Sequence, residues 1–137
     1  MKIGIDIGNV IIGGDHEDTT FFTDDFLKTP EVEDAISSIR DLRKAGHEIF
    51  LISKCSATVE SKTMQWLKFY DFWLRTGLKE FPYFVRHRMD KAPLARALEL
   101  DLFIDDRDDI IVSMHRLRYA ILFKSWEETM QEIAELT

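Results

Sequence analysis

The sequence predicts an α/β fold, a three-layer sandwich around a mainly parallel sheet of about five strands. Five short runs rich in Val, Ile, Leu and Phe indicate buried strands, and each precedes a segment whose apolar residues have helical spacing. Strands that alternate with helices form parallel sheets covered by helices. A second observation is that polar residues stand where four of these strands end.

The elements follow from local signals along the chain. Strands are expected at about 3–7, 49–52, 81–85, 100–104 and 119–123, and helices at 30–45, 57–69, 90–99, 110–117 and 126–136. Thr29 followed by Pro30 predicts the start of the first helix, and Gly46 predicts its end. Ser125 is the expected cap of the last helix, whereas residues 70–79 are aromatic-rich and ambiguous.

Length and composition favour one soluble domain over residues 1–137, with residues 12–29 as a loop or flap after the first strand. The net charge of −7 argues against a general nucleic-acid-binding surface. Cys55 is the only cysteine and no apolar run approaches the ~20 residues of a membrane span, so we expect a cytoplasmic protein. The aromatic group at 66–73 is expected to form core or the face of a homodimer.

Four strand ends carry the residues suited to chemistry. They are Asp6 on the first strand, Ser53 on the second, Lys91 just after the third, and Asp105 with Asp106 on the fourth. Because the carboxyl ends of parallel strands share one edge of the sheet, these groups are expected to converge. Carboxylate and backbone oxygens suit Mg²⁺, while a lysine and a hydroxyl can hold a phosphoryl group that a carboxylate attacks.

These motifs resemble those of the haloacid-dehalogenase-like (HAD) phosphatase superfamily. They are Asp6-Ile7-Gly8-Asn9-Val10, Ser53, Lys91 and the acidic run that contains Asp105, Asp106 and Asp109, and they span most of the chain in the family's order. The resemblance implies a Rossmann-like core, a Mg²⁺ cofactor and a phosphatase that works through an aspartyl-phosphate on Asp6. It implies that Asp6, Ser53 and Lys91 are catalytic, and that Asp6, the Gly8 carbonyl and the acidic run hold the metal. Asp106 is the favoured direct ligand of that run, with Asp105 and Asp109 either direct or supporting.

The sequence departs from the family pattern at Gly8, where most members carry a second Asp that acts as general acid. General acid catalysis contributes about 10²–10⁴ in rate, so slow turnover of alkyl phosphates is expected. Asp15, His16 or His87 could supply a substitute acid from a loop. The chain also lacks room for a large cap domain, which predicts a capless or minimally capped form with an open site.

A phosphorylated substrate, small or macromolecular, is the expected partner. The candidates for binding it are Asn9, Ser53, Lys54 and the basic run Arg86, His87 and Arg88, for which a solvated loop is the other interpretation. The competing hypothesis is a catalytically weak HAD-like domain that binds a phosphorylated ligand or a protein partner. The glycine at position 8 favours this alternative, and turnover that depends on Asp6 would exclude it.

Overall fold

The computed structural model describes residues 1–13 and 20–136 and confirms the α/β class. One sheet of five parallel strands has the order β3-β2-β1-β4-β5. The strands are β1 (Lys2–Ile5), β2 (Glu48–Lys54), β3 (Tyr83–Val85), β4 (Leu102–Asp105) and β5 (Tyr119–Leu122). In the register, Ile5 lies opposite Leu51 of β2 and Ile104 of β4. The strand order reverses between β1 and β4, and open α/β sheets bind ligands outside the strand ends at such a point.

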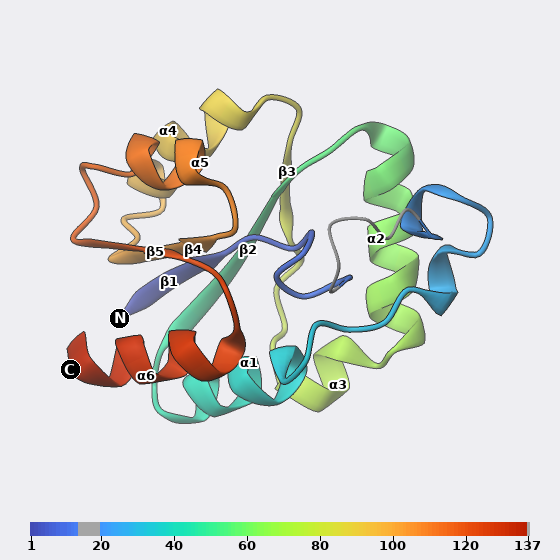
Figure 1. The fold of residues 1–137 in the computed structure, drawn as a ribbon, viewed down its shortest axis with the longest axis horizontal. Coiled ribbons are helices and arrows are strands. Elements are labelled where there is room, and N and C mark those ends of the chain that lie inside the picture. Colours follow the sequence, from blue (N-terminus) through green and yellow to red (C-terminus); the bar gives the residue numbers. More distant parts are fainter. Residues whose placement is uncertain (14–19, 137) are drawn as a thin grey trace.

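Helices cover both faces of the sheet, which gives the Rossmann-like three-layer sandwich. The α-helices are α1 (Ala35–Lys44), α2 (Ala57–Phe69), α3 (Phe72–Thr76), α4 (Lys91–Ala97), α5 (Asp108–Ser113) and α6 (Trp126–Leu136). Three short 3₁₀ helices are η1 (Thr20–Phe22), η2 (Phe26–Lys28) and η3 (Arg88–Asp90). Figure 1 shows α1 and α6 on one side of the sheet, α4 and α5 on the other, and α2 beside the segment that contains η1 and η2.

The two faces of the sheet bury separate apolar clusters. The larger cluster joins Ile3 and Ile5 of β1 to residues of α1, α2, α3 and α6. The smaller one joins Phe103 of β4 to α4 and α5. Gly4 leaves room on β1 for this smaller cluster, because a Cβ there would lie 2.7 Å from the Phe103 ring. Burial on both faces explains why residues 3–5 of β1 and 102–104 of β4 carry no polar side chain.

The predicted start of the first helix is wrong by several residues. The helix α1 begins at Ala35, and Thr29 instead ends η2. Glu31 forms an antiparallel bridge with Ile12, which keeps this part of the chain extended. The Glu31 carboxylate then accepts a hydrogen bond of 2.9 Å from the Ile36 amide in the first turn of α1. A long-range pairing has therefore outweighed the local Thr-Pro start signal.

The helices α2, α4 and α6 lie close to their predicted ranges, whereas α5 (Asp108–Ser113) begins and ends earlier than the predicted 110–117. The bounds of α2 and α6 agree with prediction, and the Ser125 hydroxyl accepts a hydrogen bond from the Glu128 amide at 3.1 Å, which confirms the predicted cap. The short helix α3 was not predicted. In the aromatic group at 66–73, Trp66 and Phe72 are buried, so part of this group belongs to the core.

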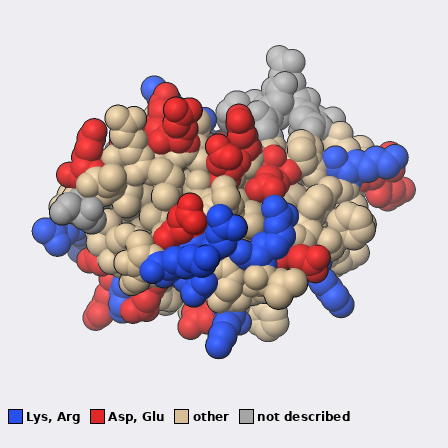
Figure 2. All heavy atoms as spheres, turned by 90° about the horizontal axis from the view of Figure 1, so that it is seen from below, with Lys and Arg blue, Asp and Glu red and all other residues tan. Residues whose placement is uncertain are grey.

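The surface carries charges of both signs. Figure 2 shows the face formed by α1, α3 and α6, where Lys and Arg side chains gather near the middle and Asp and Glu side chains lie around them. Among the described residues, no helix is long and apolar enough to span a membrane.

Candidate active site

The neighbouring ends of β1 and β4 place two carboxylates side by side. Asp6 directly follows β1, and its amide donates to the Ile104 carbonyl at 3.0 Å, which extends the pairing with β4. Asp105 is the last residue of β4. Both residues are buried, Asp105 completely and Asp6 with 7% exposed. The sheet therefore holds two acidic side chains at its switch point, away from most of the solvent.

Lys91, the first residue of α4, lies between these carboxylates. Its Nζ is 2.9 Å from Oδ1 of Asp6 and 2.8 Å from Oδ2 of Asp105. The lysine side chain is only 3% exposed, and its ammonium group lies 5.7 Å from the centre of the Phe103 ring. One buried ammonium group is thus shared by two buried carboxylates, which leaves negative charge without a matching cation.

The pKa values of all three groups reflect this imbalance. Burial raises the pKa of Asp6 to about 8, although the Lys91 ammonium opposes the shift. Burial likewise raises the pKa of Asp105, again against the effect of Lys91. Burial by itself lowers the pKa of Lys91, but the two carboxylates outweigh it, so that this pKa is raised. A further cation would relieve the repulsion and favour the ionised carboxylates.

The donor set beside Lys91 fits a hard metal ion. Carboxylate oxygens of Asp6, Asp105 and Asp106 lie within 4.8 Å of one another, so this group could bind a metal. Both oxygens of Asp105 are engaged, one by Lys91 and the other by the Arg107 amide at 3.1 Å. Asp106 is less buried and lines the cavity described below. It is therefore well placed to supply a ligand.

Asp109 lies outside this group of three carboxylates. Its oxygens accept hydrogen bonds from the Arg107 guanidinium at 3.1 and 3.3 Å, and its side chain is 57% exposed. These hydrogen bonds are the main reason that the pKa of Asp109 lies below its ordinary value. Asp109 lines the cavity described below, and its role as a direct or supporting metal ligand stays a prediction.

The loop after β1 is a tight turn that shapes the floor of the site. The Ile7 carbonyl accepts hydrogen bonds from the amides of Val10, Ile11 and Ile12, at 2.8 to 3.2 Å. Asn9 adopts the left-handed conformation with φ of 61°. The buried Trp126 indole donates to the Val10 carbonyl at 2.7 Å, which ties this turn to α6. The tight backbone path keeps the residues after Asp6 close to it.

A cavity of about 750 Å³ opens over these groups. The predicted residues that line it are Asp6, Gly8, Asn9, Ser53, Lys54, Arg88, Lys91, Asp106 and Asp109. Sequence reasoning missed Phe22, Arg107 and Asp108 as lining residues. Arg107 and Asp108 lie within the acidic run. Phe22 belongs to the predicted loop at 12–29, where the cluster of phenylalanines is the signal that could have identified it.

The rest of the predicted basic run does not reach this cavity. The Arg86 guanidinium lies 2.9 Å from the Glu60 carboxylate of α2 and donates to the Cys55 carbonyl at 3.1 Å. His87 is exposed and does not line the cavity. Asp15 and His16, the other candidates for a substitute acid, lie outside the described residues. Arg88 is thus the member of the run that faces the candidate site.

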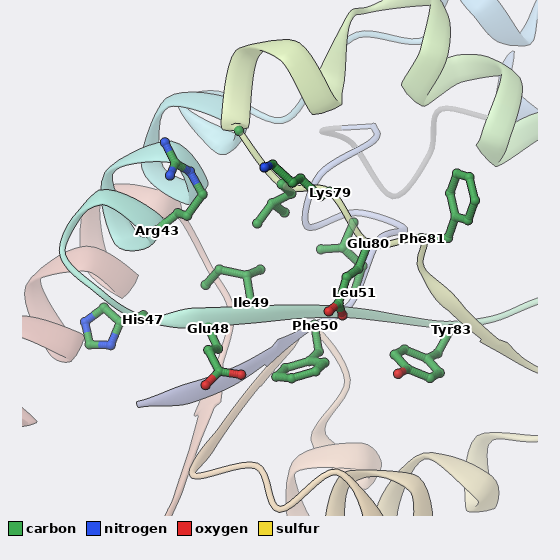
Figure 3. Close-up of a pocket in the computed structure, with 12 residues that line it drawn as sticks. Arg43, His47, Glu48, Ile49, Phe50, Leu51, Lys79, Glu80, Phe81 and Tyr83 are labelled. Carbon is green, nitrogen blue, oxygen red and sulfur yellow. The ribbon is translucent and has the colours of Figure 1, made fainter.

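Another hollow, of about 250 Å³, lies beside the first half of β2 (Figure 3). Its lining includes Ile49 and Leu51 of β2, together with Phe81 before β3 and Tyr83 at the start of β3. Arg43 at its edge already donates to the Thr76 carbonyl. The group of three carboxylates does not line this hollow, which makes the cavity at the strand ends the candidate active site.

The comparisons with known proteins agree with the fold. The sequence matches no protein-family model and no curated protein. A solved structure titled "Structure of Pnkp1/Rnl/Hen1 complex" contains a chain that is similar in fold, with a TM-score of 0.65 and 12% sequence identity. The match covers 89% of this chain but 45% of that one, so this chain spans less than half of its structural neighbour. At this identity the likeness concerns the fold alone.

Proposed function

We propose that the protein is a Mg²⁺-dependent phosphatase of the HAD type that hydrolyses phosphate monoesters through an aspartyl-phosphate on Asp6. The observation that carries the proposal is the buried Lys91 ammonium shared by Asp6 and Asp105, with Asp106 beside them at the floor of an open cavity. Perturbed carboxylates around a lysine in a cleft are a common arrangement at catalytic sites.

Each residue has a defined part in the proposed reaction. An oxygen of the Asp6 carboxylate attacks phosphorus, and the bond from phosphorus to the ester oxygen breaks. Water then hydrolyses the aspartyl-phosphate, which releases inorganic phosphate and regenerates the carboxylate. Lys91 orients Asp6 and offsets negative charge, while Ser53 and Lys54 at the end of β2 bind the phosphoryl oxygens.

The metal ligands proposed are the carboxylates of Asp6 and Asp106 with the carbonyl of Gly8, and Asp105 and Asp109 bind directly or support these ligands. A bound Mg²⁺ ion supplies positive charge that offsets the phosphoryl oxygens and the surrounding carboxylates. Since the pKa of Asp6 is about 8 without such an ion, the nucleophile would otherwise be largely protonated at neutral pH. Metal dependence and the ionisation of Asp6 are therefore linked in this proposal.

The test is hydrolysis of p-nitrophenyl phosphate with and without Mg²⁺, because this leaving group needs little protonation. We expect Mg²⁺-dependent turnover that Asp6→Asn abolishes. Asp41→Asn is the matched control, since Asp41 is exposed on α1 and pairs with Arg40. Thermal unfolding with increasing Mg²⁺ reports metal binding separately, and we expect stabilisation of the wild-type protein that is weaker in Asp6→Asn.

A second candidate is a catalytically weak domain of the same type that binds a phosphorylated ligand or a protein partner. The absence of an acid at Gly8 favours it, and the structural neighbour comes from a complex of several components. Stabilisation by Mg²⁺ without turnover of p-nitrophenyl phosphate would support this candidate over the phosphatase.

A further inference from the structure

A second cavity, called the side cavity here, lies against the candidate active site and shares part of its wall. Its volume is about 450 Å³, and the cavity that contains Asp6 measures about 750 Å³. The shared lining residues are Gly8, Asn9, Phe22, Ser53 and Lys54. A phosphate monoester held at Asp6 can therefore extend its organic group into the side cavity.

Apolar residues form much of the side cavity. Ile7, Ile12, Phe21 and Val59 line it away from the shared wall. Phe22 stands at the shared wall with 68% of its surface exposed, in edge-to-face contact with Phe21 at 6.2 Å between ring centres. A large exposed aromatic ring beside a polar site suits contact with a flat apolar group of a ligand.

Hydrogen bonds from α2 and its end hold the segment that carries these rings. The Trp66 indole donates to the Thr29 carbonyl at 2.9 Å, and the Tyr70 hydroxyl donates to the Leu27 carbonyl at 2.6 Å. Figure 1 shows this segment running alongside α2. These hydrogen bonds hold residues 27–29 of the segment, and Phe26 of the same segment packs edge-to-face on Phe21 at 6.1 Å between ring centres.

Thr29 adds a polar atom to this apolar wall. The residue is 2% exposed and lines the side cavity, and its Oγ1 has no hydrogen-bond partner in the described part of the chain. A buried hydroxyl without a partner destabilises a folded protein, so native structures rarely keep one without a reason. A polar atom on the ligand would give this hydroxyl its missing partner.

Gly8 determines the chemistry available where the two cavities meet. Apart from Gly8 and its two chain neighbours, no atom of the described residues lies within 4 Å of the position that a Cβ of Gly8 would take, so there is room for a side chain here. Among the described residues, no carboxyl or imidazole group lines the side cavity. Where the lining offers an ester oxygen no such donor, as in its described part, the oxygen departs as an anion, which aryl oxides do far more readily than alkoxides.

We infer that the substrate is an aryl phosphate monoester, with its phosphate at Asp6 and its ring in the side cavity. This inference rests on the proposed phosphatase function. As the Asp6 carboxylate oxygen bonds to phosphorus, the bond from phosphorus to the aryl oxygen breaks and its electron pair stays on that oxygen. The aryl oxide then takes a proton from water, and hydrolysis of the aspartyl-phosphate releases inorganic phosphate.

The first experiment compares kcat/KM in Mg²⁺ for 2-naphthyl phosphate, 4-methylumbelliferyl phosphate and ethyl phosphate. We expect both aryl esters to exceed ethyl phosphate by about 100-fold or more. Phe22→Ala should raise KM for the aryl esters about tenfold and affect ethyl phosphate much less. Phe81→Ala is the matched control, a phenylalanine 73% exposed that lines neither cavity, and should change nothing. Equal effects of Phe22→Ala on aryl and alkyl esters would overturn the inference.

Thr29→Val tests the role of the Thr29 hydroxyl with little change in shape. We expect KM for 4-methylumbelliferyl phosphate, whose ring carries a carbonyl, to rise about fivefold, and KM for 2-naphthyl phosphate to rise less. The variant should also resist urea better than the wild-type protein, because a buried hydroxyl without a partner is removed. A loss of stability, or the same rise in KM for both esters, would show that the Thr29 hydroxyl does not bind a polar atom of the aryl group.

Gly8→Asp restores an acid where there is room for one. Turnover of ethyl phosphate should then rise by about 100-fold and the preference for aryl esters should narrow. An unchanged preference would mean that leaving-group protonation does not select the substrate.

A tyrosine-phosphorylated peptide assayed beside 2-naphthyl phosphate shows whether the aryl ester is a phosphotyrosine side chain of a protein or a small molecule. If no ester shows Asp6-dependent turnover, the proposed function fails; if aryl and alkyl esters react alike, this inference alone fails.

Discussion

Two groups of charged side chains lie at the carboxyl end of β4 and differ in their surroundings. Asp105 is fully buried and lies 2.8 Å from Lys91, which also binds Asp6. A short distance along the chain, Arg107 and Asp109 pair at 3.1 Å with 46% and 57% of their side chains exposed. Water can replace either partner of the exposed pair, so that pair contributes little to stability. The buried charges have no such replacement, which makes each depend on the others and on any bound cation.

The largest expected effect is from Lys91→Met, which leaves two carboxylates buried without their cation. Removing one member of a buried ion pair typically destabilises a protein by about 3–5 kcal/mol, and we expect a loss of that order in urea unfolding together with loss of activity. Lys44→Met, at an exposed position of α1, is the matched control. If Lys91→Met were as stable as the wild-type protein, the buried side chains of Lys91, Asp6 and Asp105 would not depend on one another. Combining Lys91→Met with Asp6→Asn and Asp105→Asn should restore much of the stability without activity.

The second effect is a pH dependence of stability in the metal-free protein. Because burial raises the pKa of Asp6 from 3.8 to about 8, the folded state binds this proton more tightly than the unfolded state. The resulting stabilisation is complete below about pH 4 and is lost as the pH rises toward 8. We expect the wild-type protein to lose on the order of a few kcal/mol relative to Asp6→Asn over this window.

Mg²⁺ should flatten this pH dependence, since it favours the ionised carboxylates. Urea unfolding of both proteins across the pH range, with and without the ion, measures the effect. Parallel curves for wild type and Asp6→Asn in the absence of metal would contradict the raised pKa of Asp6.

An intermediate case is Glu31, whose side chain is 25% exposed. One carboxylate oxygen lies 3.4 Å from Arg75 and the other accepts the Ile36 amide at the start of α1. Glu31→Ala should lower the free energy of unfolding by about 1 kcal/mol, chiefly because the helix start loses its acceptor. Glu33→Ala, at an exposed position nearby, should have no such effect. Equal effects of the two variants would show that the cap contributes nothing.

The smallest effect is expected from Arg107→Ala in the exposed pair. Loss of the Arg107 hydrogen bonds should let the pKa of Asp109 rise toward its ordinary value, which NMR titration of the carboxylate can follow. The urea midpoint should stay within experimental error of the wild type. A clear fall in the free energy of unfolding would show that this exposed pair stabilises the protein as the buried group does, which would contradict the expected difference between them.

The structure brings predicted residues together where the signal was the end of a strand. The strand ends at Asp6, Ser53 and Asp105 were readable because apolar periodicity is local, and a parallel sheet then puts those ends on one edge. Sequence reasoning was less successful for side chains on loops. Arg86 stands next to a strand but turns to Glu60 of α2, a choice that depends on how α2 packs.

Local sequence by itself determined the α/β class, the alternation of strands and helices and the set of strand-end residues that could act together. Only the tertiary structure decided that α1 begins after the bridge between Glu31 and Ile12, and that Lys91 lies between two buried carboxylates. It also decided that a side cavity lined by the buried Thr29, whose hydroxyl has no partner among the described residues, adjoins the candidate site. The physical reason is distance along the chain: periodicity and caps act over a few residues, whereas burial and charge pairing depend on segments brought together by the whole fold.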